Sequence, residues 1–447
     1  MQLQSLQTQQ SSFKRILLNT AWLLGGKGFG AVCGIAYLAI LTRSLGLKDF
    51  GHFSLIFGTA LALQGITGVQ SWRTVVRYGT SHIHEEAWDR FGRLSMFCGL
   101  LDMLGAVAGC LIAFVAIYGF GEALDLNAAY VNEAFWFCCG MVWALVSAPT
   151  GVVRALHRFD SAVYVEATVP IGRVIAALLI WHFGATVGDF LLAWVLIDML
   201  EAICYWVMAR KLCPQSIKLR HLGEWRQALA ENPGLIRFFL FSHVTVTLDA
   251  AVRFGPLLAV GGLVGTRAAG LYRLASQITQ ALGKLSMLLT RVVYAEVARA
   301  KVAIDAAEFR KLALRTSLAA AVAGAIVIFI ALTAGETLLV WLGGEEFRGG
   351  AVILVPLAVA ASLELASVAF EPVLHASSRA GQALIARGIT LSILVTAILT
   401  VKDHGSVGIA WAVAFASGVG YLATAALTYR ALHSPGPAAA AADQILT

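Results

Sequence analysis

Four polar residues recur on one face of an apolar segment in the second half of the sequence. They are spaced at i, i+4, i+7 and i+11 and comprise Arg273, Gln277, Gln280 and Lys284. In an α-helix this spacing places the four side chains on one narrow stripe. If the segment crosses a membrane, each charge costs roughly 2.5–3.5 kcal/mol unless it faces a partner or a water-filled cavity. The stripe is therefore either a polar seam against a neighbouring helix or the cationic wall of a cavity that receives an anion, and its two positive charges favour the wall.

The preceding apolar segment carries an acid and a base four residues apart, Asp249 and Arg253. They share a helical face with Ser242 and Thr245, and residues at i and i+4 are close enough to form an ion pair. The pair is either self-neutralising or a switch, in which the aspartate exchanges a proton while the arginine contacts a substrate.

Basic residues also interrupt apolar segments in the first half. Lys27 lies near the middle of one segment within the sequence GGKGFG, and its depth leads us to interpret it as a cavity residue. Arg73 and Arg77 end the next segment, where they either guard an entrance from the cytoplasm or simply retain their loop on that side.

Acidic residues within apolar segments supply possible partners for these bases. Asp198 and Glu201 share a helical face, and they form either a coupling-ion site or ion pairs with basic residues of a neighbouring helix. Arg173 has Glu166 two helical turns before it, which predicts either an ion pair or a substrate contact at Arg173. The other acids in apolar segments are Asp102, Glu364 and Glu371.

The elements that carry these residues are predicted to be membrane spans. Of the 447 residues, 59% are hydrophobic and only 13% are charged, and the mean hydropathy is +0.77. The charged fraction is about half that of a soluble globular protein, which excludes a soluble fold. The predicted spans lie at roughly 16–42, 50–77, 94–120, 130–153, 161–184, 186–212, 236–262, 266–292, 312–342, 350–377, 380–401 and 405–431. Pro149 interrupts the fourth of them.

The distribution of Lys and Arg over the loops predicts the orientation in the membrane. With the N-terminus assigned to the cytoplasm, 23 of the 33 basic residues lie on the cytoplasmic side, five on the other side and five within spans. Because positive residues in short loops stay in the cytoplasm, both termini are predicted to be cytoplasmic. This asymmetry accounts for the net charge of +7, so the charge is no indication of nucleic-acid binding.

Two landmarks indicate that the second half of the chain repeats the first. Leu45-Gly46 corresponds to Val264-Gly265 at an offset of 219 residues, and Val187-Gly188 corresponds to Val407-Gly408 at an offset of 220. Six spans per repeat give both repeats one orientation. We therefore predict an all-α integral membrane protein of about twelve transmembrane helices, in two parallel six-helix bundles around a central cavity.

The composition along the chain predicts where the bundles begin and end. The N-terminal bundle covers residues 1–213 and the C-terminal bundle covers residues 236–433. Residues 214–235 between them are polar, basic and proline-bounded, which is typical of a cytoplasmic amphipathic linker on the membrane surface. Residues 434–447 are predicted to be a disordered tail.

This combination resembles the Wzx-type polysaccharide and O-antigen flippases, which belong to the same superfamily as multidrug (MATE) antiporters and lipid II flippases. The resemblance covers residues 12–432 and depends on the parallel repeats, the intramembrane basic residues and a Gly-x4-Gly-x-aromatic loop in each half. The loops LGLKDFGHF and VGTRAAGLY look like that family's signature.

The resemblance implies a bacterial inner-membrane protein that moves undecaprenyl-pyrophosphate-linked oligosaccharide repeat units from the cytoplasmic to the periplasmic leaflet by alternating access. It also implies that the protein has a polysaccharide polymerase as a partner and that it needs no cofactor. The family's cationic cavity lining would carry over onto Lys27, Arg253, Arg273 and Lys284, where a pyrophosphate finds positive partners away from bulk water. Gln277 and Gln280 would face the sugar, and Asp249 would couple transport to an ion gradient.

Two other functions stay open from the sequence. A multidrug or cation antiporter of the same superfamily would need an acid-dominated cavity, whereas the clearest polar stripes here contain more bases than acids. A membrane polymerase or ligase of lipid-linked sugars would need a long outer loop with catalytic Arg or His. The outer loops are short, and no nucleophile, metal-ligand spacing or Gly-rich phosphate motif is present.

Overall fold

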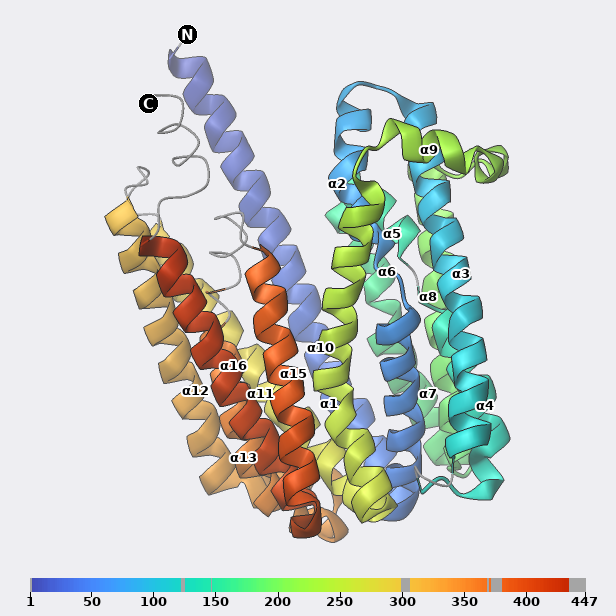
Figure 1. Ribbon diagram of the computed structural model, residues 1–447, viewed down its shortest axis with the longest axis vertical. Helices are drawn as coiled ribbons and strands as arrows, with labels where there is room; N and C mark the ends of the chain where they lie inside the picture. The colour runs from blue at the N-terminus through green and yellow to red at the C-terminus, as the bar shows by residue number, and fades with distance from the viewer. Residues whose placement is uncertain are drawn as a thin grey trace. The chain divides into compact units, whose positions relative to one another are not determined.

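The computed structural model describes residues 2–121, 125–145, 147–298, 306–367, 370 and 380–433. Side chains are described for residues 28–121, 125–145, 147–283, 318, 320–367, 370, 381–382 and 384–430. The secondary structure within the described ranges is helical, with no strand, as the sequence predicts (Figure 1). Contacts divide the chain into two compact units, one of residues 1–45 and 56–250 and the other of residues 46–55 and 251–447.

The first unit is built from α1, without its segment 46–55, and from the helices that follow it up to the first half of α10. These helices are α1 (Gln2–Thr67), α2 (Ser71–His84), α3 (Trp88–Phe120), η2 (Ala128–Tyr130), α4 (Val131–Trp143), α5 (Ala148–Ala155), α6 (Phe159–Glu166), α7 (Thr168–Phe183), α8 (Val187–Leu212), η3 (Pro214–Ser216), η4 (Leu219–Glu224) and α9 (Trp225–Glu231).

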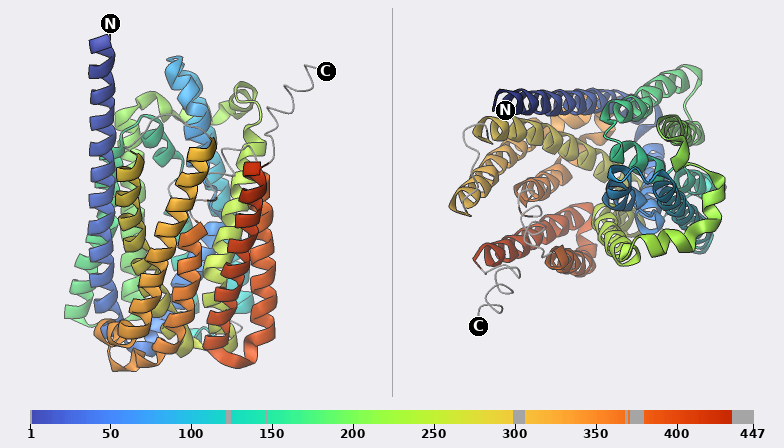
Figure 2. Two further views of the ribbon diagram at one scale, coloured as in Figure 1. Left: turned by 90° about the vertical axis from the view of Figure 1, so that its left-hand side faces the viewer. Right: turned by 90° about the horizontal axis from the view of Figure 1, so that it is seen from above.

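The second unit contains segment 46–55, the second half of α10 and the remaining helices. These are α10 (Leu235–Val264), α11 (Thr266–Ala298), α12 (Ala306–Gly343), η5 (Glu345–Gly350), α13 (Ala351–Ser367), α15 (Ala380–Val401), η6 (Lys402–His404) and α16 (Gly405–His433). Figure 2 shows that the long helices within each unit run side by side. The predicted boundaries of the two bundles stay a prediction.

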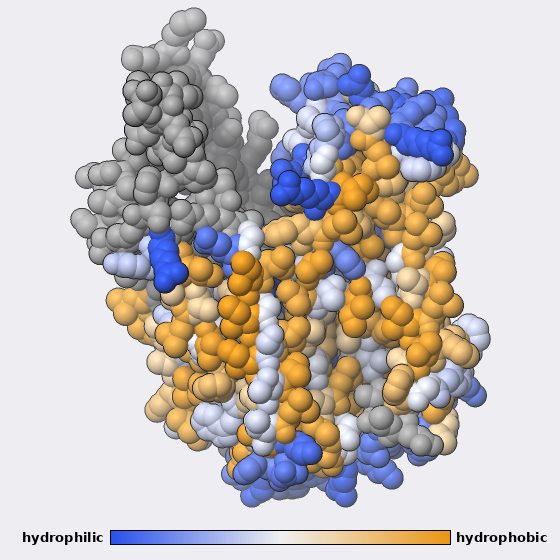
Figure 3. All heavy atoms as spheres, viewed as in Figure 1, coloured by the Kyte–Doolittle hydropathy of each residue, from blue (hydrophilic) through white to orange (hydrophobic). Residues whose placement is uncertain are grey.

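Nine helical segments among the described residues are long and apolar enough to cross a membrane. Two of them, the 57-residue segment Gly28–His84 and the 47-residue segment Leu384–Arg430, each contain two predicted spans. The predicted span at roughly 266–292 corresponds to α11, which is helical but is not among the nine because its polar stripe lowers its hydropathy. Figure 3 shows hydrophobic residues along the helices of the first unit and hydrophilic residues over α9. The protein is therefore a multi-pass membrane protein.

The two copies of the glycine loop pack against each other within the second unit. Gly46 and Gly265 both adopt positive φ angles, +70° and +110°, which let the chain turn at the same point of each copy. A Cβ atom at Gly51 would clash with the Thr266 carbonyl oxygen, and one at Gly270 would lie 2.9 Å from the Leu47 carbonyl oxygen. Gly51 and Gly270 are 219 residues apart, and so are Leu47 and Thr266. Because each loop contacts the equivalent position of the other, the contact is consistent with two copies of one repeated motif.

The second and fourth predicted spans are not continuous helices, and the sequence predicts only the break in the fourth. α1 ends at Thr67 and α2 begins at Ser71, so residues 68–70 break the second span. α4 ends at Trp143 and α5 begins at Ala148, with Pro149 in the first turn of α5. Proline suits that position because the first-turn N–H groups have no partner within the helix. The predicted interruption at Pro149 is confirmed.

The linker between the halves folds onto the first unit. It contains η3, η4 and α9, and several hydrogen bonds and ion pairs hold it to the ends of α2 and α3. Arg93 Nε donates a hydrogen bond of 3.0 Å to Glu231, and His82 Nε2 lies 2.9 Å from Asn232 Oδ1. Its predicted place on the membrane surface stays a prediction.

Candidate functional site

A polar cluster lies among the helices of the second unit, and we call it the Arg253 cluster. Arg253 Nη2 of α10 donates a hydrogen bond of 3.0 Å to Gln280 Oε1 of α11. Gln280 Nε2 in turn donates a hydrogen bond of 3.0 Å to Ser276 Oγ, one helical turn earlier. The cluster therefore joins two of the polar stripes predicted from the sequence. Arg253 is exposed, and a guanidinium carries more N–H donors than one amide oxygen uses, so it can also bind an anion.

The fourth member of the Arg253 cluster is Glu364, which comes from α13. Its carboxylate interacts electrostatically with Arg253, and also with Tyr272 of α11. The sequence places Glu364 in an apolar segment but gives no indication of its partner, because α10 and α13 are about 110 residues apart in the chain. The Arg253 cluster thus combines one base with a nearby acid, an amide and a hydroxyl.

The other predicted substrate-binding residues of the second unit lie on the same helix as Gln280. Arg273 and Gln277 are half-buried on α11. Lys284 lies on α11 and Lys27 lies on α1, but both side chains are outside the described residues. Asp249 is exposed on α10 and belongs to the first unit, whereas Arg253 belongs to the second. The predicted roles of these residues stay predictions.

A second polar cluster lies in the first unit, and we call it the Arg173 cluster. Arg173 of α7 donates two hydrogen bonds, of 2.8 and 3.0 Å, to the carboxylate of Asp198 on α8. Both side chains are largely buried, at 12% and 15% exposure. The guanidinium also lies 5.5–5.9 Å from the ring centres of Tyr37, Phe57 and Trp194. Asp198 is therefore the ion-pair partner of Arg173, and the expected alternative partner, Glu166, is not.

The remaining members of the Arg173 cluster are two glutamates and an arginine. Glu166 of α6 accepts hydrogen bonds from Arg154 Nη2 of α5 at 3.4 Å and from the Tyr205 hydroxyl of α8 at 3.1 Å. Glu201 of α8 interacts electrostatically with Asp198, Glu166 and Arg173. Among the side chains that the structure describes, no ion pair reaches Glu201. The Arg173 cluster therefore has three acids and two bases. Among the described side chains, Glu201 is the acid of this cluster that forms no ion pair.

The predicted entrance residues lie on the short helix α2. Arg73 and Arg77 are both exposed. The Arg77 guanidinium lies 4.4 Å from the ring centre of Phe238 on α10, a cation–π contact that restricts its side chain. Arg73 makes a similar contact with the adjacent Trp72 at 5.5 Å. Their exposure leaves the charged groups accessible to an anion.

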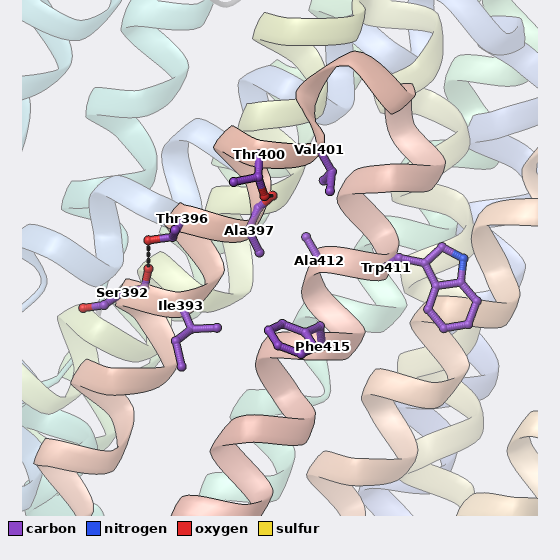
Figure 4. Close-up of a pocket in the computed structure, with 9 residues that line it drawn as sticks. All are labelled: Ser392, Ile393, Thr396, Ala397, Thr400, Val401, Trp411, Ala412 and Phe415. Atoms are coloured by element: carbon purple, nitrogen blue, oxygen red, sulfur yellow. Dashed lines mark hydrogen bonds between the residues drawn. The ribbon is translucent and has the colours of Figure 1, made fainter.

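An apolar groove of about 750 Å³ lies between α15 and α16 (Figure 4). It is lined by Ser392, Ile393, Thr396, Ala397, Thr400, Val401, Trp411, Ala412 and Phe415. The three hydroxyl groups donate hydrogen bonds to carbonyl oxygens of their own helix. The groove therefore offers a surface to hydrocarbon but no charged group to an anion.

Comparison with solved structures identifies the fold. The structure is similar to a multidrug resistance MATE family transporter of the MOP superfamily in its inward-facing conformation, with a TM-score of 0.70, 14% identity and coverage of 90% of this chain and 95% of that chain. It is also similar to the lipid II flippase MurJ in an inward closed conformation, with a TM-score of 0.69, 11% identity and coverage of 92% and 87%. At 14% and 11% identity these similarities show the fold alone, and it agrees with the all-α membrane fold that the sequence predicts.

Comparison of sequences gives a closer relationship. The chain is 25% identical over 345 residues to the inner membrane protein YghQ of Escherichia coli (strain K12), which covers 75% of this chain and 94% of that protein. The sequence profile of the family described as "Polysaccharide biosynthesis protein" matches residues 16–295. That match spans more than half of the sequence and agrees with the resemblance found in the signature loops. The chain therefore belongs to the polysaccharide biosynthesis protein family, and its helices are those of a multi-pass membrane protein.

Proposed function

We propose that this protein moves undecaprenyl-pyrophosphate-linked oligosaccharide repeat units from the cytoplasmic to the periplasmic leaflet of the inner membrane by alternating access. The units would then reach a polysaccharide polymerase, for an exopolysaccharide or an O-antigen. The observation that carries the proposal is Arg253, which is exposed on a membrane helix and donates to the neutral amide of Gln280. The polysaccharide biosynthesis family to which the chain belongs supports a sugar-containing substrate. The lipid II flippase MurJ, which has the same fold, supports a lipid-linked substrate.

The chemistry of the Arg253 cluster suits the head of such a substrate. A guanidinium presents a planar fork of N–H donors that can bind two phosphate oxygens at once, and such charge-assisted hydrogen bonds are stronger away from bulk water. Gln277 and Gln280 supply amide groups for sugar hydroxyls, and Arg273 and Lys284 of the same unit are proposed to add positive charge. The role of Lys27, which belongs to the first unit, stays a prediction. The groove between α15 and α16 offers no charge, so we assign the pyrophosphate to the Arg253 cluster and not to the groove.

We further propose that transport is coupled to an ion gradient through Glu201. Asp198 already neutralises Arg173, whereas Glu201 adds a carboxylate to a cluster that has one acid more than it has bases. Such a carboxylate among membrane helices can exchange a proton or bind a cation. Asp249 is the second candidate for this role. In the Glu201→Gln variant, transport should no longer accelerate when a proton or sodium gradient is imposed, whereas the exposed Glu336→Gln variant should respond like wild type. Unchanged acceleration in Glu201→Gln would exclude this residue.

The proposed direction requires both termini to lie in the cytoplasm, as the loop charges predict. A fluorescent protein that matures only in the cytoplasm should be bright when fused after His433. A periplasmic phosphatase fused at the same position should be inactive. The reverse result would contradict the orientation.

The experiment that tests the proposed function is deletion of the gene. We expect surface polysaccharide to disappear and lipid-linked repeat units to accumulate on the cytoplasmic side. A plasmid with the wild-type gene should restore the polysaccharide, whereas one with Arg253→Ala should not. Arg348→Ala is the matched control, because Arg348 already pairs with Glu345 and Glu336. Normal polysaccharide in the deletion strain, with no second transporter of this family present, would overturn the proposal.

One observation favours a second candidate function, the export of cationic drugs. The acid surplus of the Arg173 cluster is the charge expected of a cation site, and the MATE transporter has the same fold. If this function holds, the deletion strain should become more sensitive to cationic dyes while its surface polysaccharide stays normal. The flippase proposal expects the opposite pattern.

A further inference from the structure

The breaks in the second and fourth spans meet at one buried carboxylate, that of Asp102 on α3. Asp102 Oδ2 accepts a hydrogen bond of 2.9 Å from the Ser71 hydroxyl and one of 2.8 Å from the Ala148 backbone N–H. Ser71 is the first residue of α2 and Ala148 is the first residue of α5. One side chain of a third helix therefore holds the first turns of two short helices.

The two helix starts are also joined to each other. Ser147 Oγ accepts a hydrogen bond of 2.9 Å from the Trp72 backbone N–H, so the residue before α5 receives an N–H group of α2. Neither Gln70 nor Ser147 caps its own helix with its side chain. Unpaired N–H groups in the first turn of a buried helix are costly. The contacts from Asp102 and from Ser147 supply acceptors that the local sequence does not provide.

The packing around these contacts is tight. A Cβ atom at Gly105 of α3 would clash with the Thr67 carbonyl oxygen, at the end of α1. A Cβ atom at Gly151 of α5 would lie 2.7 Å from Val75 Cβ of α2. α3 therefore passes close to the break in the second span, and α2 and α5 pack with little space between them. In this arrangement a change at Asp102 would move both short helices.

The second carboxyl oxygen of Asp102 is also informative. Oδ1 is buried and has no hydrogen-bond partner in the part of the chain that the structure describes. An asparagine could accept the same two hydrogen bonds on one oxygen, so the position does not need an acid for its hydrogen bonds alone. Leucine at this position removes both acceptors, whereas asparagine keeps them.

We propose that Asp102 is a positioning residue for transport, which fixes α2 and α5 and thereby the guanidinium groups of Arg73 and Arg77. Arg73 follows Ser71 by two residues, so any movement of the first turn of α2 displaces it. The inference rests on the proposed function, in which Arg73 and Arg77 receive the anionic substrate at the cytoplasmic entrance. Asp102 itself acts through the two helices and does not contact the substrate.

The first test needs no substrate and uses amide hydrogen exchange of the full-length protein in lipid nanodiscs. In Asp102→Leu, exchange at residues 71–75 and 148–152 should rise roughly tenfold or more, because both acceptors are lost. Asp102→Asn should show a smaller rise, since its oxygen can still accept both hydrogen bonds. Residues 170–180 of α7 should not change. Wild-type exchange at both helix starts in Asp102→Leu would overturn the inference.

Matched variants keep this test decisive. Ser95→Ala removes a different polar group from α3, a hydroxyl that donates to the Phe91 carbonyl of its own helix, and it should leave both helix starts unchanged. If Asp102→Leu does not fold, Ser71→Ala removes one of the two donors and should raise exchange at residues 71–75. No change there would also overturn the inference.

A double-mutant cycle on transport separates positioning from general stability. Asp102→Leu should reduce transport roughly tenfold in the wild-type background but far less in the Arg73→Ala background, because both changes disable the same group. Equal fold losses in both backgrounds would overturn the positioning role. If the protein does not move polysaccharide units at all, the proposed function fails, while the exchange experiment still decides whether Asp102 holds both helices.

Discussion

Two arginines of the membrane helices lie in very different surroundings. Arg173 forms an ion pair with Asp198, is enclosed by three aromatic rings and is largely buried. Arg253 is exposed and donates to the neutral amide of Gln280. An arginine that is already neutralised and enclosed has little capacity to bind an incoming anion, whereas Arg253 is exposed and keeps N–H donors available even with Glu364 nearby. The two residues therefore suit different roles, Arg173 in stability and Arg253 in binding.

The buried ion pair gives a prediction for stability. Arg173→Ala should destabilise the protein by about 3–5 kcal/mol, because it leaves Asp198 as an uncompensated charge among apolar groups. The double variant Arg173→Met with Asp198→Leu should recover most of that loss. Thermal unfolding in detergent measures both effects. An Arg173→Ala variant as stable as wild type would show that the pair contributes nothing to the fold.

At the scale of elements, the paired glycine loops give a second prediction. Gly51→Ala should destabilise the protein by about 1–3 kcal/mol, because its methyl group would press against the Thr266 backbone, which cannot rotate away. Gly388→Ala on α15 is the matched control, because a Cβ atom there meets nothing within 4 Å and alanine favours the helix by up to about 1 kcal/mol. Melting temperatures of the two variants should therefore shift in opposite directions. Equal melting temperatures would contradict the close contact between the loops.

The linker gives a prediction with a defined pH dependence. Glu224 is hydrogen-bonded to His221 Nδ1 at 2.7 Å, and this bond holds the pKa of the carboxyl below its usual value of 4.5. A lowered pKa stabilises the folded linker above pH 4.5, and that contribution is lost as the pH falls through the folded-state pKa. At pH 7, hydrogen exchange at residues 214–232 should therefore be faster in Glu224→Gln than in wild type, and the difference should shrink below pH 4.5. A difference that does not change with pH would contradict the role of the carboxylate.

The sequence predicts the long helices well and the broken ones less well. Hydropathy alone predicts α3 and α8, since each is a long and mostly apolar segment with polar ends. Pro149 marks the break before α5, but residues 68–70 contain no proline, and the break before α2 depends on contacts with Asp102 and Ser147. Those partners are about 30 and 75 residues away in the chain. Local patterns contain no information on contacts at that distance.

For the candidate site, the sequence likewise predicts features of single helices but not the contacts between helices. Helical spacing puts Gln277 and Gln280 on one face and makes Arg253 a binding candidate, because these inferences need only one helix each. The hydrogen bond from Arg253 to Gln280 and the proximity of Glu364 involve three helices. Likewise, the choice of Asp198 over Glu166 as the partner of Arg173 depends on how α7 packs against α8. The candidate side chains can therefore be predicted from the sequence, whereas their hydrogen-bond and ion-pair partners depend on how the helices pack.

At the scale of the whole molecule, the units contain clusters of opposite character. The Arg173 cluster of the first unit has an excess of acid, which suits a coupling ion, and the Arg253 cluster of the second unit presents an exposed base, which suits an anionic substrate. A transporter that is driven by an ion gradient needs both functions, because the gradient supplies the free energy and the substrate site selects the transported molecule. The chain is thus proposed to divide these two tasks between its two units.

The most direct test of this account measures translocation of a pyrophosphate-linked oligosaccharide in proteoliposomes that contain the purified full-length protein. Wild type and the control Arg348→Ala should carry the lipid-linked sugar to the opposite leaflet at equal rates. Arg253→Ala should be slower by roughly 10–100-fold, the effect of one lost charge-assisted hydrogen bond of about 1.5–3 kcal/mol, and Arg253→Lys should lie between them. A wild-type rate in Arg253→Ala, or no translocation by folded wild-type protein under an imposed ion gradient, would contradict the account.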